Sequence, residues 1–291
     1  MGFNPLYPLK PRLLQESYYE NINFFVSDYI VSQKRIEGLL KVLRQQEENH
    51  RVIGGDLLEM ATREGLDVSW SSYLSELPEN VLDFVIDASN HKLPVRTCKS
   101  CHKGRQLIRV LQSCLPVLVA ERHDKVLSYI LNEADMQSAE LYADIQGMRT
   151  LEGNTIPSVT KNGISINLSH NSKRLKPDIV IIEENKIYIF EISVPFECNI
   201  ERRHEEKEGK YRAICRDILE DTRPRLGCEL HCIEVGARGF LTRRNRSRLT
   251  FLYQLTRRGG TAGLREFINR VSTLACLASF DIYQRHQRSE L

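Results

Sequence analysis

The chain has 291 residues, with 41 Lys and Arg against 38 Asp and Glu, so its formal net charge at pH 7 is only +3. This length allows one sizeable core and a smaller lobe, and no stretch approaches the roughly 18 apolar residues that a membrane-spanning helix needs. The N-terminus lacks the basic and apolar segments of a secretion signal, and eight unevenly spaced cysteines are typical of reduced thiols. We therefore expect an intracellular protein without a membrane segment.

Residues 1–95 are predicted to be mainly helical. A periodic apolar run covers 36–43, and further short helices are expected at 57–61 and 74–86. This region carries no motif with a recognisable chemistry, so it suggests no function.

An amphipathic helix is predicted at 117–132, and irregular sequence follows it up to a hairpin at 176–193. Both arms of the hairpin are rich in β-branched and aromatic residues, and a polar turn separates them. If Glu184-Asn185 is a two-residue loop, counting outward from it places Asp178 directly opposite Glu191.

Opposed residues of an antiparallel pair share one face of the sheet, with Cβ atoms about 5 Å apart. The negative charges of Asp178 and Glu191 repel each other at that separation unless something neutralises them, and a divalent cation does so economically. The alternative is that Asp178 only begins the strand while Glu191 faces water at a sheet edge.

A helix is predicted at 200–219, because its apolar residues lie in one narrow stripe. Lys207 falls in the middle of this stripe, and Lys210 lies about 60° from its centre. If the helix packs on the hairpin, the Lys207 ammonium can orient a water and stabilise the charge on a phosphate under attack. The alternative is a lysine whose stem covers apolar surface while its head stays in water. The stripe consists of Ile200, Tyr211, Ile214 and Ile218.

A strand is predicted at 229–235, and Gly236-Ala237-Arg238-Gly239 ends it. The order helix, hairpin, helix and strand predicts an α/β core with a mixed sheet and the carboxylates at its centre.

Several short motifs follow one another between about residues 88 and 240. They are Cys98-Lys99-Ser100-Cys101 with Cys114, Arg122-His123-Asp124, Pro177-Asp178 with Glu191, Val194-Pro195-Phe196-Glu197 and Lys207-Glu208-Gly209-Lys210-Tyr211. In this order they resemble the restriction-like endonuclease region, of PD-(D/E)xK type, at the C-terminus of site-specific non-LTR retrotransposon polyproteins that insert into ribosomal DNA. The resemblance implies a restriction-endonuclease-like core at 117–240 with a mixed sheet and a central hairpin.

The same resemblance implies a nuclear endonuclease that nicks DNA with Mg²⁺ or Mn²⁺, and the RNA of the element is a second candidate partner. Asp178, Glu191 and the carbonyl of Ile192 would hold the metal. The usual lysine two residues after the second acid is Ser193 here. This retrotransposon branch is similar in placing its lysine on the following helix, which implies a catalytic role for Lys207, with Lys210 in reserve.

Segment 96–116 resembles the CCHC zinc finger of the family, but Arg109 stands where the family has a histidine. Zinc needs four ligands in a tetrahedron, and arginine cannot bind a cation. The alternative is a degenerate finger with reduced thiols. The candidate zinc ligands are Cys98, Cys101 and Cys114, with His102, His91 or His123 as the fourth.

Segment 241–291 is expected to be a basic helical extension, with an apolar helix at 271–283 and a polar tail at 284–291. Between residues 235 and 270 the chain has nine arginines against one glutamate. The guanidinium fork suits phosphate, although a solvated basic face is the alternative. The candidate DNA contacts are Arg238, Arg243, Arg244, Arg246 and Arg248, together with Arg122 and His123.

Two other functions are open. The chain lacks the paired-aspartate loop of a reverse transcriptase, so it resembles only the C-terminal part of such a polyprotein. A remnant that binds nucleic acid without cleaving it is one alternative to an active nuclease. An unrelated α/β domain used for protein contacts is the other.

Overall fold

The structure is a computed structural model. It describes residues 68–89, 92–95, 97, 106–134, 140–143, 158–161, 164–167, 177–183, 185–222, 227–257 and 262–288, together with Lys34 and Gly38. Most of the helix predicted at 36–43 and all of the helix predicted at 57–61 lie outside these residues.

A four-stranded mixed sheet lies at the centre, as predicted, in the order β1-β4-β5-β6. Its strands are β1 (Glu140–Ala143), β4 (Ile179–Glu183), β5 (Lys186–Ser193) and β6 (Gly227–Glu234). The β1–β4 and β4–β5 pairs are antiparallel, whereas β5 and β6 are parallel. The expectation of irregular sequence before the hairpin is wrong, because β1 and a separate hairpin of β2 (Ser158–Lys161) and β3 (Ile164–Asn167) lie there.

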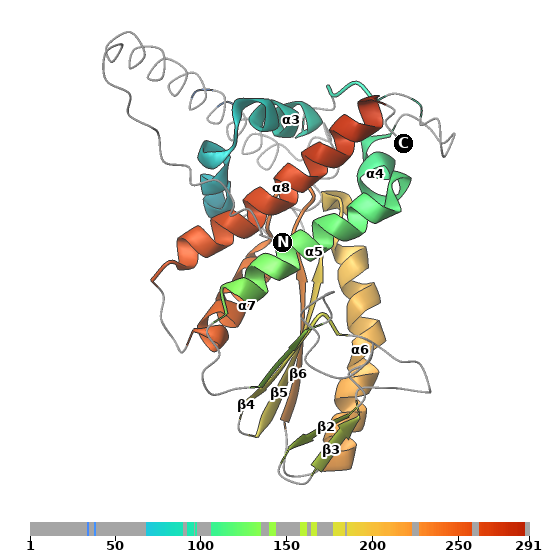
Figure 1. The fold of residues 1–291 in the computed structure, drawn as a ribbon, viewed down its shortest axis with the longest axis vertical. Coiled ribbons are helices and arrows are strands. Elements are labelled where there is room, and N and C mark those ends of the chain that lie inside the picture. Colours follow the sequence, from blue (N-terminus) through green and yellow to red (C-terminus); the bar gives the residue numbers. More distant parts are fainter. Residues whose placement is uncertain are drawn as a thin grey trace, which may run out of the picture.

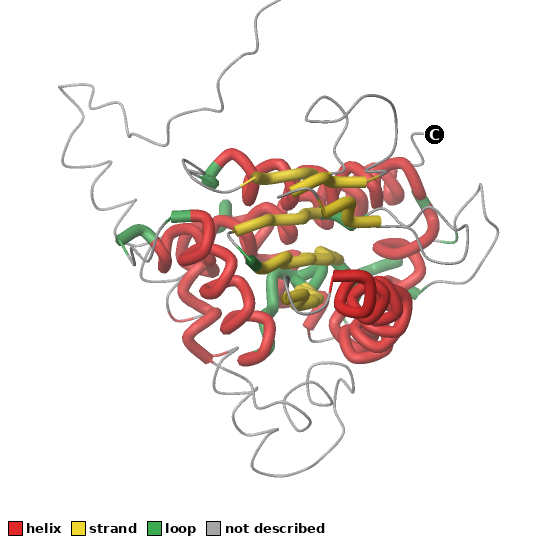
Figure 2. The backbone as a smooth tube through the Cα atoms, turned by 90° about the horizontal axis from the view of Figure 1, so that it is seen from below, coloured by secondary structure: helices red, strands yellow, loops and turns green. Residues whose placement is uncertain are grey.

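The β4–β5 hairpin has the register that the sequence predicts, with Glu183 opposite Lys186 and Ile179 opposite Phe190. Both strands are almost continuously apolar because helices cover both faces of the sheet (Figure 2). One face packs on α6 (Ile200–Thr222). This contact buries three of the four residues of the predicted stripe, whereas Ile200 packs in the main core, and the inward orientation of the helix is confirmed. The residues in the contact are Val180, Ile182, Ile187 and Ile189 from the sheet and Tyr211, Ile214 and Ile218 from α6.

The other face belongs to the main core, to which three long helices contribute. These are α5 (Pro116–Asn132), α7 (Arg243–Thr256) and α8 (Leu264–Arg288), and α5 and α8 lie side by side (Figure 1). Tyr188 and Phe190 of β5 stack on His231 and make tilted ring contacts with Phe251 on this side. No helix in the described part of the chain is long and apolar enough to cross a bilayer.

Two predicted boundaries are corrected. The helix expected at 74–86 is divided into a 3₁₀ segment, η1 (Val68–Glu76), and α3 (Glu79–Ser89), because Pro78 cannot continue a helix from the residues before it. The polar tail expected at 284–291 is helical as far as Arg288. Gln287 and Tyr283 donate hydrogen bonds to the Pro94 carbonyl, so this last part of α8 is bound to the segment at 92–95.

A buried ion pair joins Arg238, in the loop after β6, to Glu197 of the short helix η3 (Glu197–Asn199). Arg238 Nε donates to Glu197 Oε2 at 2.9 Å, and its main-chain N–H donates to Oε1 at 2.8 Å. The guanidinium also donates to the Ala88 carbonyl and lies over the rings of Phe196 and Phe240. Since neither side chain of the pair is exposed, removal of one partner leaves an uncompensated charge.

We therefore expect Arg238→Met to lower the free energy of unfolding by about 3–5 kcal/mol, because Glu197 would stay buried without its cation. Urea denaturation followed by circular dichroism measures the change. A matched control is Arg285→Ala, which removes the exposed ion pair with Asp281 and should cost less than about 1 kcal/mol. Equal losses in the two variants would contradict this assignment.

Candidate functional site

Asp178 and Glu191 face each other at one end of the hairpin, as the register requires. The Asp178 N–H donates to Glu191 Oε1 at 3.2 Å, and the Ile192 N–H donates to Asp178 Oδ2 at 2.7 Å. Asp178 is 9% exposed and Glu191 only 1% exposed. The alternative in which Glu191 faces water at a sheet edge is therefore wrong, because β5 has a neighbour on each side.

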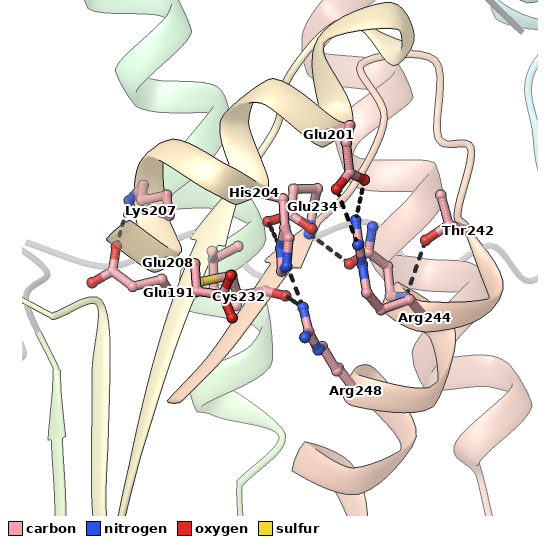
Figure 3. Close-up of polar contacts among 12 residues, drawn as sticks. Glu191, Glu201, His204, Lys207, Glu208, Cys232, Glu234, Thr242, Arg244 and Arg248 are labelled. Atoms are coloured by element: carbon pink, nitrogen blue, oxygen red, sulfur yellow. Dashed lines mark hydrogen bonds and ion pairs between the residues drawn. The ribbon is translucent and has the colours of Figure 1, made fainter. Parts of the chain in front are cut away.

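Lys207 reaches both carboxylates from α6. Its Nζ lies 2.5 Å from Glu191 Oε2 (Figure 3). The same Nζ lies 3.6 Å from Asp178 Oδ2. The side chain is 26% exposed, so the ammonium is not simply a head extended into water. Lys210, the predicted reserve, instead donates to its neighbour Tyr211 and lies over that ring.

His123 is a third member of the site, contributed by α5. Its Nε2 lies 3.4 Å from Asp178 Oδ2, and its Nδ1 lies 3.0 Å from Asp124 Oδ1. The sequence predicted a DNA contact or a possible zinc ligand at this position. The structure places His123 against the first carboxylate, so it contributes to the same site as Lys207.

The pKa values of these groups are strongly shifted. Burial and the nearby charge of Asp178 raise the pKa of Glu191 to about 7, although Lys207 opposes the shift. Burial alone would raise the pKa of Asp178, but His123 and Lys207 outweigh it and lower that pKa. Burial by itself would lower the pKa of His123, yet Asp178 and, to a smaller extent, Asp124 raise it to about 9. Two cations of the protein therefore offset the two carboxylates.

A metal is thus not required to hold the carboxylates together, which differs from the argument made from sequence. The donor set still suits Mg²⁺, which binds through one or two carboxylate groups and keeps several waters. Among the described residues no group of three or more His, Cys, Asp or Glu side chains is arranged to hold a metal. Ser193, at the usual place of the lysine, has a buried hydroxyl without a hydrogen-bond partner in the described part of the chain.

Arg122 and Arg238, two of the predicted DNA contacts, are turned into the protein. The guanidinium of Arg122 donates to the Val194 carbonyl at 2.7 Å and to Ser279 Oγ at 2.9 Å. Burial lowers the pKa of Arg122 to about 10, which still leaves it charged at neutral pH. Because both side chains are at most 1% exposed, the structure gives them internal roles in place of phosphate contact.

Only part of the predicted finger can be followed. Cys98, Cys101, His91 and His102 lie outside the described residues. Cys114 is buried, and its Sγ lies 3.6 Å from His286 Nδ1 of α8. His123, one of the alternatives for the fourth zinc ligand, is engaged with Asp178 instead.

A second buried polar group, not predicted from the sequence, lies beside Lys207 on α6. His204 of α6 lies 3.1 Å from Glu234, the last residue of β6, and neither is appreciably exposed. A helical period of about 100° per residue places His204 on the inward stripe between Ile200 and Lys207, which was a usable signal. Nothing in the sequence identified Glu234 as its partner.

Comparison with protein-family models gave no match, and a search of curated proteins found no relative of this chain.

The bond between His123 and Asp178 should make stability depend on pH. Because the folded-state pKa of His123, about 9, exceeds its ordinary value of 6.5, the bond stabilises fully below pH 6.5 and is lost as pH rises through 9. Relative to His123→Asn, wild type should lose about 3 kcal/mol of unfolding free energy across this window. Urea titrations of both proteins in EDTA measure the difference. A constant difference from pH 6 to 10 would contradict the assignment.

Proposed function

We propose that the chain is a metal-dependent endonuclease that nicks DNA, built on a restriction-endonuclease-like core and derived from a non-LTR retrotransposon. The observation that carries the proposal is the contact of one lysine with two opposed, buried carboxylates at the centre of a mixed sheet. Buried, mutually perturbed ionisable groups of this kind are more frequent at functional sites than elsewhere.

In this proposal Asp178 and Glu191 hold Mg²⁺, with the carbonyl of Ile192 as a further oxygen donor. When bound, the ion supplies Lewis-acid activation of water and neutralises charge on the phosphate. The Lys207 ammonium orients the attacking water and stabilises the negative charge that develops on the phosphate. His123 keeps Asp178 in place through its contact with Oδ2.

DNA would be held mainly by the arginines of the C-terminal part that are not buried. Arg243 begins α7 and is exposed, so its guanidinium can approach a phosphate. Arg246 on the same helix is half-buried and is the second candidate. A chromosomal DNA target would place the action of the protein in the nucleus.

The alternative is a remnant that binds nucleic acid without cleaving it. The observation in its favour is that His123 and Lys207 already compensate both carboxylates. A metal must then compete with cations of the protein for the same oxygens. In an active enzyme, the binding free energy of metal and substrate together exceeds the cost of displacing these cations. In an inactive remnant it does not.

Nicking of supercoiled plasmid in Mg²⁺ tests the proposal. We expect wild type to convert plasmid to the open circle, and Asp178→Ala combined with Glu191→Ala to abolish conversion. Lys207→Met should lower the rate by about 10²–10³-fold, the usual effect of losing one charge-stabilising group. The matched control is Glu183→Ala, which removes a carboxylate from the turn of the same hairpin and should cleave normally.

Wild-type activity no higher than that of the double variant would refute the enzyme. If both proteins then bind DNA with the same steep dependence on salt, the binding remnant is the better description. If neither binds DNA, both nucleic-acid functions fail and a domain for protein contacts remains.

A further inference from the structure

Three polar side chains, two of them buried and one half-buried, form a cluster one helical turn before Lys207 (Figure 3). They are His204 of α6, Glu234 at the end of β6 and Arg248 of α7. His204 Nδ1 lies 3.1 Å from Glu234 Oε1. The second oxygen of Glu234 has no hydrogen-bond partner among the described residues, so the buried carboxylate depends on His204.

Arg248 ties the cluster to α7. Its Nη1 donates to the Cys232 carbonyl at 2.6 Å and lies 3.2 Å from His204 Nδ1. Because a carboxylate oxygen accepts a hydrogen bond, we assign the His204 Nδ1 proton to the bond with Glu234, and the bond of Arg248 within the cluster is then the one to the Cys232 carbonyl. One turn earlier, Arg244 Nη2 contacts Glu201 Oε2 at 2.9 Å. The first two turns of α6 are therefore fastened both to β6 and to α7.

The start of α7 is itself fixed to β6. Thr242 caps the helix by accepting the Asn245 N–H at 3.1 Å, and Asn245 Oδ1 accepts the Glu234 N–H at 3.2 Å. Asn245 is fully buried. Glu234 therefore contacts both helices: its main-chain N–H binds Asn245 of α7, and its carboxylate binds His204 of α6.

The cluster and the carboxylate site are connected through α6 and through the paired strands β5 and β6. Cys232 is the register partner of Glu191 across β5 and β6, and Glu234 is the partner of Ser193 two residues further on. His204 and Lys207 are neighbours on the inward face of α6. A movement of the first turns of α6 would separate Lys207 from Glu191 and would also leave Glu234 buried without its partner, which is strongly unfavourable.

We propose that His204, Glu234 and Arg248 are positioning residues that hold Lys207 on the two carboxylates. Arg248, and Arg244 beside it, act on DNA cleavage through helix α6 and not through contact with phosphate. The effect on cleavage rests on the function proposed above, whereas the placement of Lys207 can be measured without it.

The test compares His204→Leu with His204→Asn. The amide nitrogen of asparagine can donate to Glu234 in place of Nδ1, so His204→Asn keeps the bond and His204→Leu removes it. Urea denaturation first establishes that each variant is folded under the assay conditions. Arg248→Met, which removes the donor to the Cys232 carbonyl but keeps Glu234 and His204, provides a second route if His204→Leu does not fold.

Acetylation of Lys207 by an N-hydroxysuccinimide ester, followed by mass spectrometry, reports its placement directly. An ammonium held between two carboxylates reacts slowly. We expect acetylation at Lys207 to be about tenfold faster in His204→Leu and Arg248→Met and close to wild type in His204→Asn. Exposed Lys125 should react equally in all the proteins and serves as the internal control. Unchanged acetylation of Lys207 in a folded His204→Leu or Arg248→Met protein would overturn the proposal.

Plasmid nicking and DNA binding complete the experiment. In His204→Leu and Arg248→Met we expect kcat to fall by about tenfold or more with little change in KM, and His204→Asn should restore it. Arg248→Met should leave the slope of log affinity against log salt unchanged, whereas Arg243→Gln should reduce it by about one. A reduced slope in Arg248→Met would show a phosphate contact and overturn the indirect role. If wild type does not nick DNA, the function fails while the acetylation result still decides the placement of Lys207.

Discussion

The close approach of Asp178 and Glu191 is the constraint on which the arrangement around the sheet depends. Two buried carboxylates on one face of a hairpin are costly unless positive charge or protonation of one of them offsets their repulsion. Lys207 of α6 and His123 of α5 supply positive charge here. The two helices are thus joined through the charge balance of one site, in addition to the apolar packing that each makes with its own partners.

Several arginines of this protein make internal contacts, so the number of arginines in a segment did not predict how many of them lie at the surface. A guanidinium can bind a carboxylate, a carbonyl and an aromatic ring at once, so it can join distant elements in a dry interior. Arg238 does this between Glu197, Ala88 and two phenylalanine rings. The same properties suit phosphate, so a run of arginines in the sequence predicts a strong binding group without indicating what it binds.

What could be predicted from the sequence was set by local periodicity. The pairing of Asp178 with Glu191 follows from counting outward from a two-residue turn, and the inward direction of Lys207 follows from a 3.6-residue period. Contacts between elements far apart in the chain could not be counted. His123 meets Asp178, and His204 meets Glu234, only because α5, α6 and β6 pack as they do. The separation of Arg238 and Arg122 from the surface is of the same kind, since burial depends on the whole fold.

For the proposed function, the difference between an active nuclease and a binding remnant would lie in a competition between a metal and the protein's own cations for the carboxylate oxygens. Lys207 and His123 hold the site together without metal, so each contact that stabilises the fold also opposes the entry of Mg²⁺. Both cations occupy oxygens that a metal would use. Lys207 Nζ lies 2.5 Å from Glu191 Oε2, and His123 Nε2 lies 3.4 Å from Asp178 Oδ2. In the proposed nuclease, turnover would therefore depend on how readily the two carboxylates exchange these contacts for a metal.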